Sequence, residues 1–275
     1  MIDIVNDPPN NLSLTKVFIA EELKSRGGWQ AYLYHLNGPL IRIIRPDGKI
    51  LEISGSTPPT TSYAAGNLSD DKYACYLKLN EQSLPTPKTY LATTLDEALD
   101  IFYLEQWQKT VIKPLDSSHG NGVTINITTS EEVEEAWNQA VLYSPFVLIQ
   151  EQSNLPFDLR FTVVDSRVVG AVIRVPARVI GNGINTVQDL IKKENNDPLR
   201  GENYTKPKNK IDVLRATSYL REKIQYVPKV DEEVQVIGTA NLGTGGELID
   251  VTDDTPDWLI ELAEKVSKTC DLQVS

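Results

Sequence analysis

The sequence predicts a mixed α/β fold of the α+β class, in which most strands pair as hairpins. Short runs of apolar and β-branched residues recur along the chain, and several are separated only by a short turn such as Asp165-Ser166-Arg167. The segments with helical periodicity begin at Ser, Thr or Asp, which are residues that cap helix N-termini. Because helices and strands do not alternate strictly, a doubly wound parallel sheet is not predicted.

Residues 1–66 are predicted to form a small N-terminal α/β lobe. A helix is expected over residues 14–26, where apolar side chains recur at helical spacing and Gly27-Gly28 follows. Strands are expected over three further segments, the last two of which are joined by Pro46-Asp47-Gly48. These segments are residues 30–36, 40–45 and 50–53.

Residues 67–150 are predicted to form a second unit that combines helices and strands. One helix is expected to start near Ser69-Asp70-Asp71 and to reach about residue 82. Thr94 and Thr129 are each followed three residues later by Glu, which predicts capping boxes for two more helices. These helices are expected to reach about residues 107 and 143, and the strands to cover residues 89–92, 111–114, 123–127 and 146–150.

Residues 151–275 are predicted to form a third unit. It begins with a hairpin around Asp165-Ser166-Arg167, followed by a helix that Thr186 caps. Residues 197–209 are polar and contain proline, so we expect an exposed excursion there. A strand over residues 234–237, a glycine-rich turn over residues 241–246 and a helix from Pro256 complete the chain.

The composition is that of an ordinary globular protein, with 40% hydrophobic and 24% charged residues. The chain carries 38 acidic and 27 basic residues, a formal net charge of -11, which argues against binding nucleic acid or an anionic membrane. No apolar run is long enough to cross a bilayer, and the first residues lack the pattern of a secretory signal. We therefore expect a cytoplasmic protein in which Cys75 and Cys270 are reduced thiols.

A lysine stands before a loop rich in small residues: Lys113-Pro114 is followed by Ser117-Ser118-His119-Gly120-Asn121-Gly122 and then by a β-branched strand. A P-loop would place its lysine after the glycines and would open a helix, so this loop is a different device. Glycines at a hairpin tip let backbone N–H groups converge on an anion, and the lysine adds a positive charge. The alternative is an ordinary glycine-rich turn beside a surface lysine.

Several strings in the same order resemble the ATP-grasp ligases, and within them the module shared by cyanophycin synthetases and bifunctional glutathione-synthesising ligases. The resemblance covers residues 69–275, with residues 67–150 as the subdomain that carries the hairpin lid and residues 151–275 as the C-terminal subdomain. The strings are Lys113-Pro114 with its hairpin, Asp158-Leu159-Arg160, Arg174-Val175-Pro176-Ala177, Asn196-Asp197-Pro198-Leu199-Arg200-Gly201 and Ala240-Asn241-Leu242-Gly243-Thr244-Gly245-Gly246.

The resemblance implies an enzyme that forms an amide or peptide bond between a carboxylate and an amine. ATP would phosphorylate the carboxylate, and the amine would attack the resulting acylphosphate. Lys72 and Lys113 would then contact the nucleotide phosphates, and Gln150 and Glu151 would lie at the adenine. Asp158 would hold the ribose hydroxyls, with a surface acid or an ion-pair partner of Arg160 as the alternatives. The lid residues that would fold over the phosphates are Ser118, Gly120 and Gly122.

Two arginines are implied as catalytic residues. Arg174 is flanked by Ile173 and Val175, so its guanidinium needs a partner, which would be a phosphate oxygen or a neighbouring acid. Arg160 lies on the adjacent strand. By the same resemblance the substrate would bind against Asn241, Gly245 and Gly246.

The sequence departs from the family pattern at its metal ligands. In the family, an aspartate and a Glu-x-Asn pair hold two Mg²⁺ ions. In our alignment these residues would lie just beyond Ser275. We therefore assign no metal ligand in this chain and expect a truncated C-terminal lobe. A non-catalytic ATP-binding protein with a degenerate ATP-grasp fold is the alternative function. The sequence leaves the substrates and homo-oligomerisation open.

Overall fold

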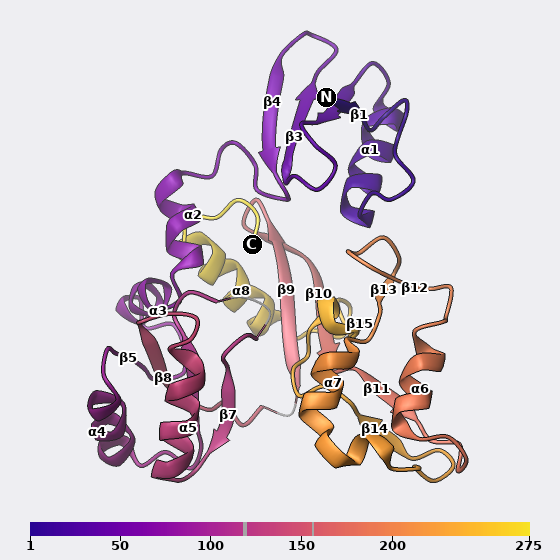
Figure 1. Ribbon diagram of the computed structural model, residues 1–275. Coiled ribbons are helices and arrows are strands. Elements are labelled where there is room, and N and C mark those ends of the chain that lie inside the picture. The colour runs from indigo at the N-terminus through magenta and orange to yellow at the C-terminus, as the bar shows by residue number, and fades with distance from the viewer. Residues whose placement is uncertain (118–119, 156) are drawn as a thin grey trace.

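The computed structural model describes residues 1–117, 120–155 and 157–275 (Figure 1). Its larger sheets have the strand orders β1-β2-β3-β4, β5-β8-β6-β7 and β15-β10-β9 within that part of the chain. All pairings in these sheets are antiparallel. The prediction of a mixed α/β fold built from hairpins is therefore confirmed.

The N-terminal lobe lies at the top of Figure 1 as one sheet with one helix against it. Buried side chains of the helix, among them Ala20 and Leu23, pack with Ala31, Leu33 and Ile41 of the sheet. The predicted helix over residues 14–26 is confirmed, and the second strand ends earlier than predicted. The elements are β1 (Ile2–Asp3), α1 (Leu14–Arg26), β2 (Gln30–Leu33), β3 (Leu40–Ile44) and β4 (Ile50–Ser54).

Two consecutive helices, α2 (Tyr63–Asp70) and α3 (Lys72–Glu81), connect this lobe to the second sheet. The carboxylate of Asp71 accepts hydrogen bonds of 2.9 Å from the backbone N–H groups of Tyr73 and Ala74, which caps α3 as predicted. The helix before it, α2, was not predicted. Lys72 is therefore the first residue of α3.

The second sheet is covered on one face by two helices. Ile112 and Ile149 pack with α4 and α5 in one core, so their strand neighbours Lys113, Leu148 and Gln150 point to the opposite face. Thr94 and Thr129 cap these helices, but the predicted capping box is complete only at Thr129. Both helices end sooner than expected. The elements are β5 (Thr89–Ala92), α4 (Leu95–Glu105), β6 (Thr110–Pro114), β7 (Thr124–Ile127), α5 (Ser130–Ala140) and β8 (Val147–Glu151).

The third sheet lies at the centre of Figure 1, with α8 against it. Phe161 and Val163 line an apolar cavity with residues of α8 on that face. The backbone of Ser275 exchanges hydrogen bonds of 2.9 and 3.0 Å with Val163, which extends the sheet beyond β9. The elements are β9 (Asp158–Val164), β10 (Arg167–Val175), β15 (Glu247–Asp250) and α8 (Asp257–Thr269).

The remaining elements surround a separate buried core that includes Val187, Ile191 and Ile211. The expectation of an exposed excursion over residues 197–209 is wrong at Arg200 and Asn209, which are buried. The elements are β11 (Arg178–Ile180), α6 (Val187–Glu194), β12 (Arg200–Gly201), β13 (Lys208–Asn209), α7 (Val213–Leu220), the 3₁₀ helix η1 (Arg221–Gln225), β14 (Glu233–Gln235) and the 3₁₀ helix η2 (Leu242–Thr244).

No helix in the described part of the chain is both long and apolar enough to span a bilayer.

Candidate active site

The two predicted phosphate-binding lysines, Lys72 and Lys113, lie at the base of the glycine hairpin. The ammonium of Lys72 donates to the carbonyl oxygens of Leu115 and Ser117, with a distance of 2.9 Å to the latter. Burial, and then the positive charge of Lys72, lower the pKa of Lys113. Both effects disfavour the charged form of Lys113, and a bound anion would reverse the second of them.

Lys113 is oriented by a chain of hydrogen bonds across the second sheet. Its ammonium donates to Gln150 Oε1 at 2.8 Å, and Gln150 Nε2 donates to Thr89 Oγ1 at 2.6 Å. Gln150 is thus in contact with Lys113, and its role at the adenine stays a prediction. Glu151 is exposed at the end of β8, and its backbone N–H donates to the carbonyl oxygen of Lys88 at 2.9 Å.

The hairpin tip has the backbone that its glycines predict. Gly120 and Gly122 have φ values of 76° and 68°, in the left-handed region that favours glycine. A Cβ on Gly122 would lie 2.7 Å from the ring of Tyr143, so close packing is a second reason for glycine there. Ser118, also predicted at the phosphates, lies outside the described residues.

Asp158 and Arg174 form an ion pair across β9 and β10. Arg174 Nε donates to Asp158 Oδ1 at 2.9 Å, and Nη2 donates to Oδ2 at 2.7 Å. The neighbouring acid named as the alternative partner of Arg174 is therefore present, and the predicted roles of both residues at ATP stay untested. Arg160 is exposed. It lies on the same face of the sheet as Arg174, because its cross-strand partner Val172 is two residues from Arg174.

A cavity of about 680 Å³ joins the hairpin to the third sheet. Ile125 of β7 lines it from the lid, and Asp158 and Arg174 line it from the sheet. Among the described residues its wall includes neither Lys72 nor Lys113. A second cavity of about 400 Å³ shares Ser153 and Leu155 with it and is lined by residues 85–87 and 151–155.

The predicted substrate-binding turn is held by contacts within the protein. Asn241 Oδ1 accepts a hydrogen bond of 2.8 Å from Gly243 N. Gly245 has a φ of 101°, and a Cβ there would lie 2.5 Å from the Cα of Ile211. A Cβ on Gly246 would lie 2.8 Å from the carbonyl oxygen of Val175. Packing alone accounts for both glycines, so contact with a substrate stays a prediction.

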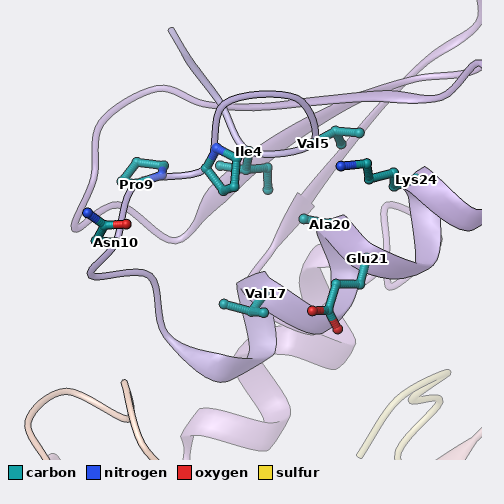
Figure 2. Close-up of a pocket in the computed structure, with 9 residues that line it drawn as sticks. Ile4, Val5, Pro9, Asn10, Val17, Ala20, Glu21 and Lys24 are labelled. Carbon is teal, nitrogen blue, oxygen red and sulfur yellow. The ribbon is translucent and has the colours of Figure 1, made fainter.

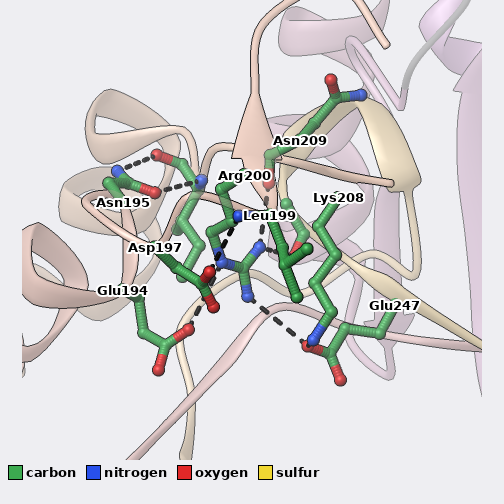
Figure 3. A network of polar contacts seen from close by, with 10 residues as sticks. Glu194, Asn195, Asp197, Leu199, Arg200, Lys208, Asn209 and Glu247 are labelled. Carbon is green, nitrogen blue, oxygen red and sulfur yellow. Dashed lines mark hydrogen bonds and ion pairs between the residues drawn. The ribbon is translucent and has the colours of Figure 1, made fainter. Parts of the chain in front are cut away.

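Arg200 fixes this turn and was not predicted to do so. Its side chain is 2% exposed, and its Nη1 donates to the carbonyl oxygens of Asn209 and Gly245 at 2.9 and 3.1 Å. Glu194 and Glu247 pair with it at 3.3 and 3.5 Å (Figure 3). The sequence signal nearest to this residue is the string Asn196-Asp197-Pro198. It does not indicate that Arg200 is buried.

A second contact that the sequence did not predict joins the hairpin to α7. Arg215 Nη2 donates to Asn121 Oδ1 at 2.6 Å. A Cβ on Gly120 would lie 3.4 Å from Thr239 Cγ2, which places the tip against the segment after β14 as well. The glycine hairpin therefore contacts the C-terminal subdomain.

The N-terminal lobe has a cavity of its own, of about 300 Å³ (Figure 2). Apolar residues such as Ile4, Val17 and Ala20 line it, with Glu21 and Lys24 of α1 at its edge. None of the predicted site residues lines it, so it is separate from the site described above.

The described residues offer no group of three or more His, Cys, Asp or Glu side chains that could hold a metal ion.

Comparisons with known proteins identify the domain that carries this site. Residues 69–179 match the model of the RimK-like ATP-grasp domain. This segment is an ATP-grasp domain. The resemblance predicted from the sequence is therefore confirmed, and the domain includes Lys72, Lys113, Asp158 and Arg174.

Curated relatives and a solved structure extend the similarity beyond the ATP-grasp domain. The chain is 36% identical over 212 residues to cyanophycin synthetase of Trichormus variabilis, which covers 76% of this chain and 23% of that protein. It is 31% identical over 220 residues to the glutathione biosynthesis bifunctional protein GshAB of Listeria welshimeri, covering 78% and 28%. A bifunctional glutathione synthetase from Pasteurella multocida shares the fold over 96% of this chain and 36% of its own, with a TM-score of 0.63 and 24% identity. The chain thus spans about a quarter of the curated relatives.

Proposed function

We propose that this chain is the ATP-grasp part of an ATP-dependent carboxylate–amine ligase. It would form an amide or peptide bond through an acylphosphate, with an amino acid or small peptide as substrate. The similarity to a cyanophycin synthetase and to a glutathione-biosynthesis protein supports this class of reaction. ATP and two free thiols are typical of the cytoplasm, which is the location we propose.

The observation that carries the proposal is the pair of lysines at the hairpin base. The ammonium groups of Lys72 and Lys113 repel each other, because Lys72 is close enough to lower the pKa of Lys113. Lys113 is also partly buried. Such an arrangement costs free energy unless an anion binds to it. A triphosphate under a hairpin whose glycines have positive φ supplies that anion.

The Asp158–Arg174 pair leaves both side chains free to contact ATP. The pair uses two of the five guanidinium N–H groups, so three can still donate to phosphate oxygens. Each carboxylate oxygen accepts one bond from Arg174 and has a second lone pair for a ribose hydroxyl. We propose that Asp158 binds the ribose, and that Arg174 and Arg160 stabilise the acylphosphate.

The experiment that tests the proposal is an ADP-release assay with ATP, Mg²⁺, a panel of amino acids or dipeptides as carboxylates, and a panel of amines. We expect ADP release that requires both a carboxylate and an amine and that Lys113→Met reduces at least about 100-fold. Lys109→Met is the matched control, because Lys109 bonds to Asn126 at 2.9 Å on the exposed outer part of the sheet. ADP release that is the same with and without the carboxylate would contradict the ligase proposal.

A non-catalytic nucleotide-binding protein with a degenerate ATP-grasp fold is the second candidate. A nucleotide titration distinguishes the two candidates. Lys113-dependent binding of ATP without carboxylate-dependent ADP release would favour the second one.

A further inference from the structure

The two cysteines of the chain, 195 positions apart in the sequence, lie at one contact between two helices. Helix α3 packs against α8, with Cys75 in the first turn of α3 and Cys270 capping the C-terminus of α8. Cys75 and Lys78 stand three residues apart on one face of α3. Cys75 raises the pKa of the Cys270 thiol, and the charge of Lys78 lowers it. This face of α3 is therefore directed at the end of α8.

We propose that Cys75 and Cys270 are a disulfide-forming site that links α3 to α8, with a low-molecular-weight disulfide as the oxidant. Cys75 is partly exposed and Cys270 is buried, so the two thiols differ in their access to an oxidant. Helix α3 packs against α8, and the two thiols are close enough for Cys75 to raise the pKa of Cys270. A disulfide requires their Cβ atoms to reach a separation of about 3.5–4.5 Å.

The difference in exposure assigns the order of the steps. The Cys75 thiolate attacks one sulfur of the small disulfide RSSR, whose S–S bond breaks and releases RS⁻, and a mixed disulfide forms on Cys75. Cys270 then loses its proton to solvent and attacks Cys75 Sγ, which forms the protein disulfide and releases the second RS⁻. In total two protein thiols are oxidised by two electrons, and RSSR is reduced to two RSH.

The second step is the slow one at neutral pH. Burial, and then the neighbouring Cys75 thiol, raise the pKa of Cys270 to about 11. Since the thiolate is the nucleophile, the rate of closure increases with pH up to that value.

The link would join two parts of the candidate site. Helix α3 begins with Lys72, one turn before Cys75, and α8 packs on β9 and β10, which carry Arg160 and Arg174. A disulfide here would hold the helix of the lysine against the sheet of the arginines. The proposal itself requires only the two thiols and does not depend on the ligase activity.

The test treats the folded, reduced chain with oxidised glutathione, quenches it with an alkylating agent and measures the intact mass. We expect a mass lower by two hydrogens, no alkylated cysteine, a linked pair of Cys75 and Cys270 peptides, and full reversal by dithiothreitol. Cys270→Ser should keep glutathione on Cys75, and Cys75→Ser should leave Cys270 unmodified. A lasting glutathione adduct on Cys75 of the unsubstituted chain, a disulfide between two chains, or two thiols that remain reduced would each overturn the proposal.

Discussion

Arg174 lies directly opposite Asp158 in the β9–β10 hairpin, and the two side chains share two hydrogen bonds of 2.9 and 2.7 Å. The pairing depends on an irregularity between Val168 and Gly170 that shifts the register by one residue. Without that shift Arg174 would stand opposite Phe157. The bulge therefore places a carboxylate and a guanidinium together at the wall of the larger cavity.

Arg174→Lys tests the importance of the planar guanidinium. A lysine keeps the charge but cannot make two parallel bonds, so we expect kcat for ADP release to fall about 100-fold or more. The melting temperature should change little, because 29% and 38% of the two side chains are exposed and exposed ion pairs stabilise weakly. The matched control is Arg178→Lys, which alters a surface pair with Glu233 of 2.7 Å. Equal losses of kcat in the two variants would contradict the role of Arg174.

Because the pKa of Lys113 is lowered, we expect nucleotide binding to depend on pH. Burial and Lys72 lower its pKa in the free protein, whereas a bound phosphate favours the ammonium and raises that pKa. The affinity for ATP should therefore be highest at pH values below the pKa that Lys113 has in the free protein. It should fall by up to about tenfold per pH unit as the pH rises through that value.

The measurement is the Kd for ATP between neutral pH and about pH 10, below the ordinary lysine pKa of about 10.4. Lys113→Arg should bind ATP with a flat profile over this range, because a guanidinium stays charged. The same slope in both proteins would assign the titration to another group.

The sequence predicted those parts of the fold that local signals determine. Asp71, Thr94 and Thr129 cap helices where their side chains and spacing indicated. Helix α2 was missed because its only strong start signal, Ser62, precedes a short segment that contains glycine. The positive φ values of Gly120 and Gly122 agree with the local sequence, since glycine adopts such values without steric cost.

The parts of the site that the sequence could not predict depend on distant contacts. The burial of Arg200 results from Gly245 and Glu247, more than 40 positions away, and no local pattern encodes that packing. The Arg174–Asp158 pair required the position of a bulge, and sequence periodicity alone does not locate one. The contact between Asn121 and Arg215 joins two subdomains and has no counterpart in the local sequence.

Glu247→Gln tests the network around Arg200. Lys208, at 2.6 Å, is the main group that lowers the pKa of Glu247 below its ordinary value. An acid with a lowered pKa stabilises the fold above its unfolded-state pKa, and this contribution is lost as pH falls through the folded-state pKa. We expect the variant to lose about 1–3 kcal/mol at neutral pH and the difference to close in acid. Urea unfolding at several pH values measures this, with Glu233→Gln on the surface as the control.

Gly245→Ala separates the effect of crowding from that of backbone strain. Gly245 and Gly27 both have positive φ, but a Cβ meets the Cα of Ile211 at 2.5 Å in the first case and nothing within 4 Å in the second. We expect Gly27→Ala to cost about 1 kcal/mol through strain and Gly245→Ala to cost at least about 3 kcal/mol. Free energies of unfolding from urea titrations decide this, and equal costs would show that the turn can move away from Ile211.

The contact between Asn121 and Arg215 predicts that α7 helps to hold the hairpin over bound nucleotide. Asn121→Ala should raise the KM for ATP about fivefold to tenfold, because the 2.6 Å bond that steadies the tip is lost. Arg215→Met should have a similar effect, and the double variant should be no worse than the more affected single variant, since residues in contact are not additive. The double-mutant cycle in KM, together with melting temperatures to exclude general unfolding, measures the coupling. Independent, additive effects would mean that the hairpin reaches its position over the phosphates without support from α7.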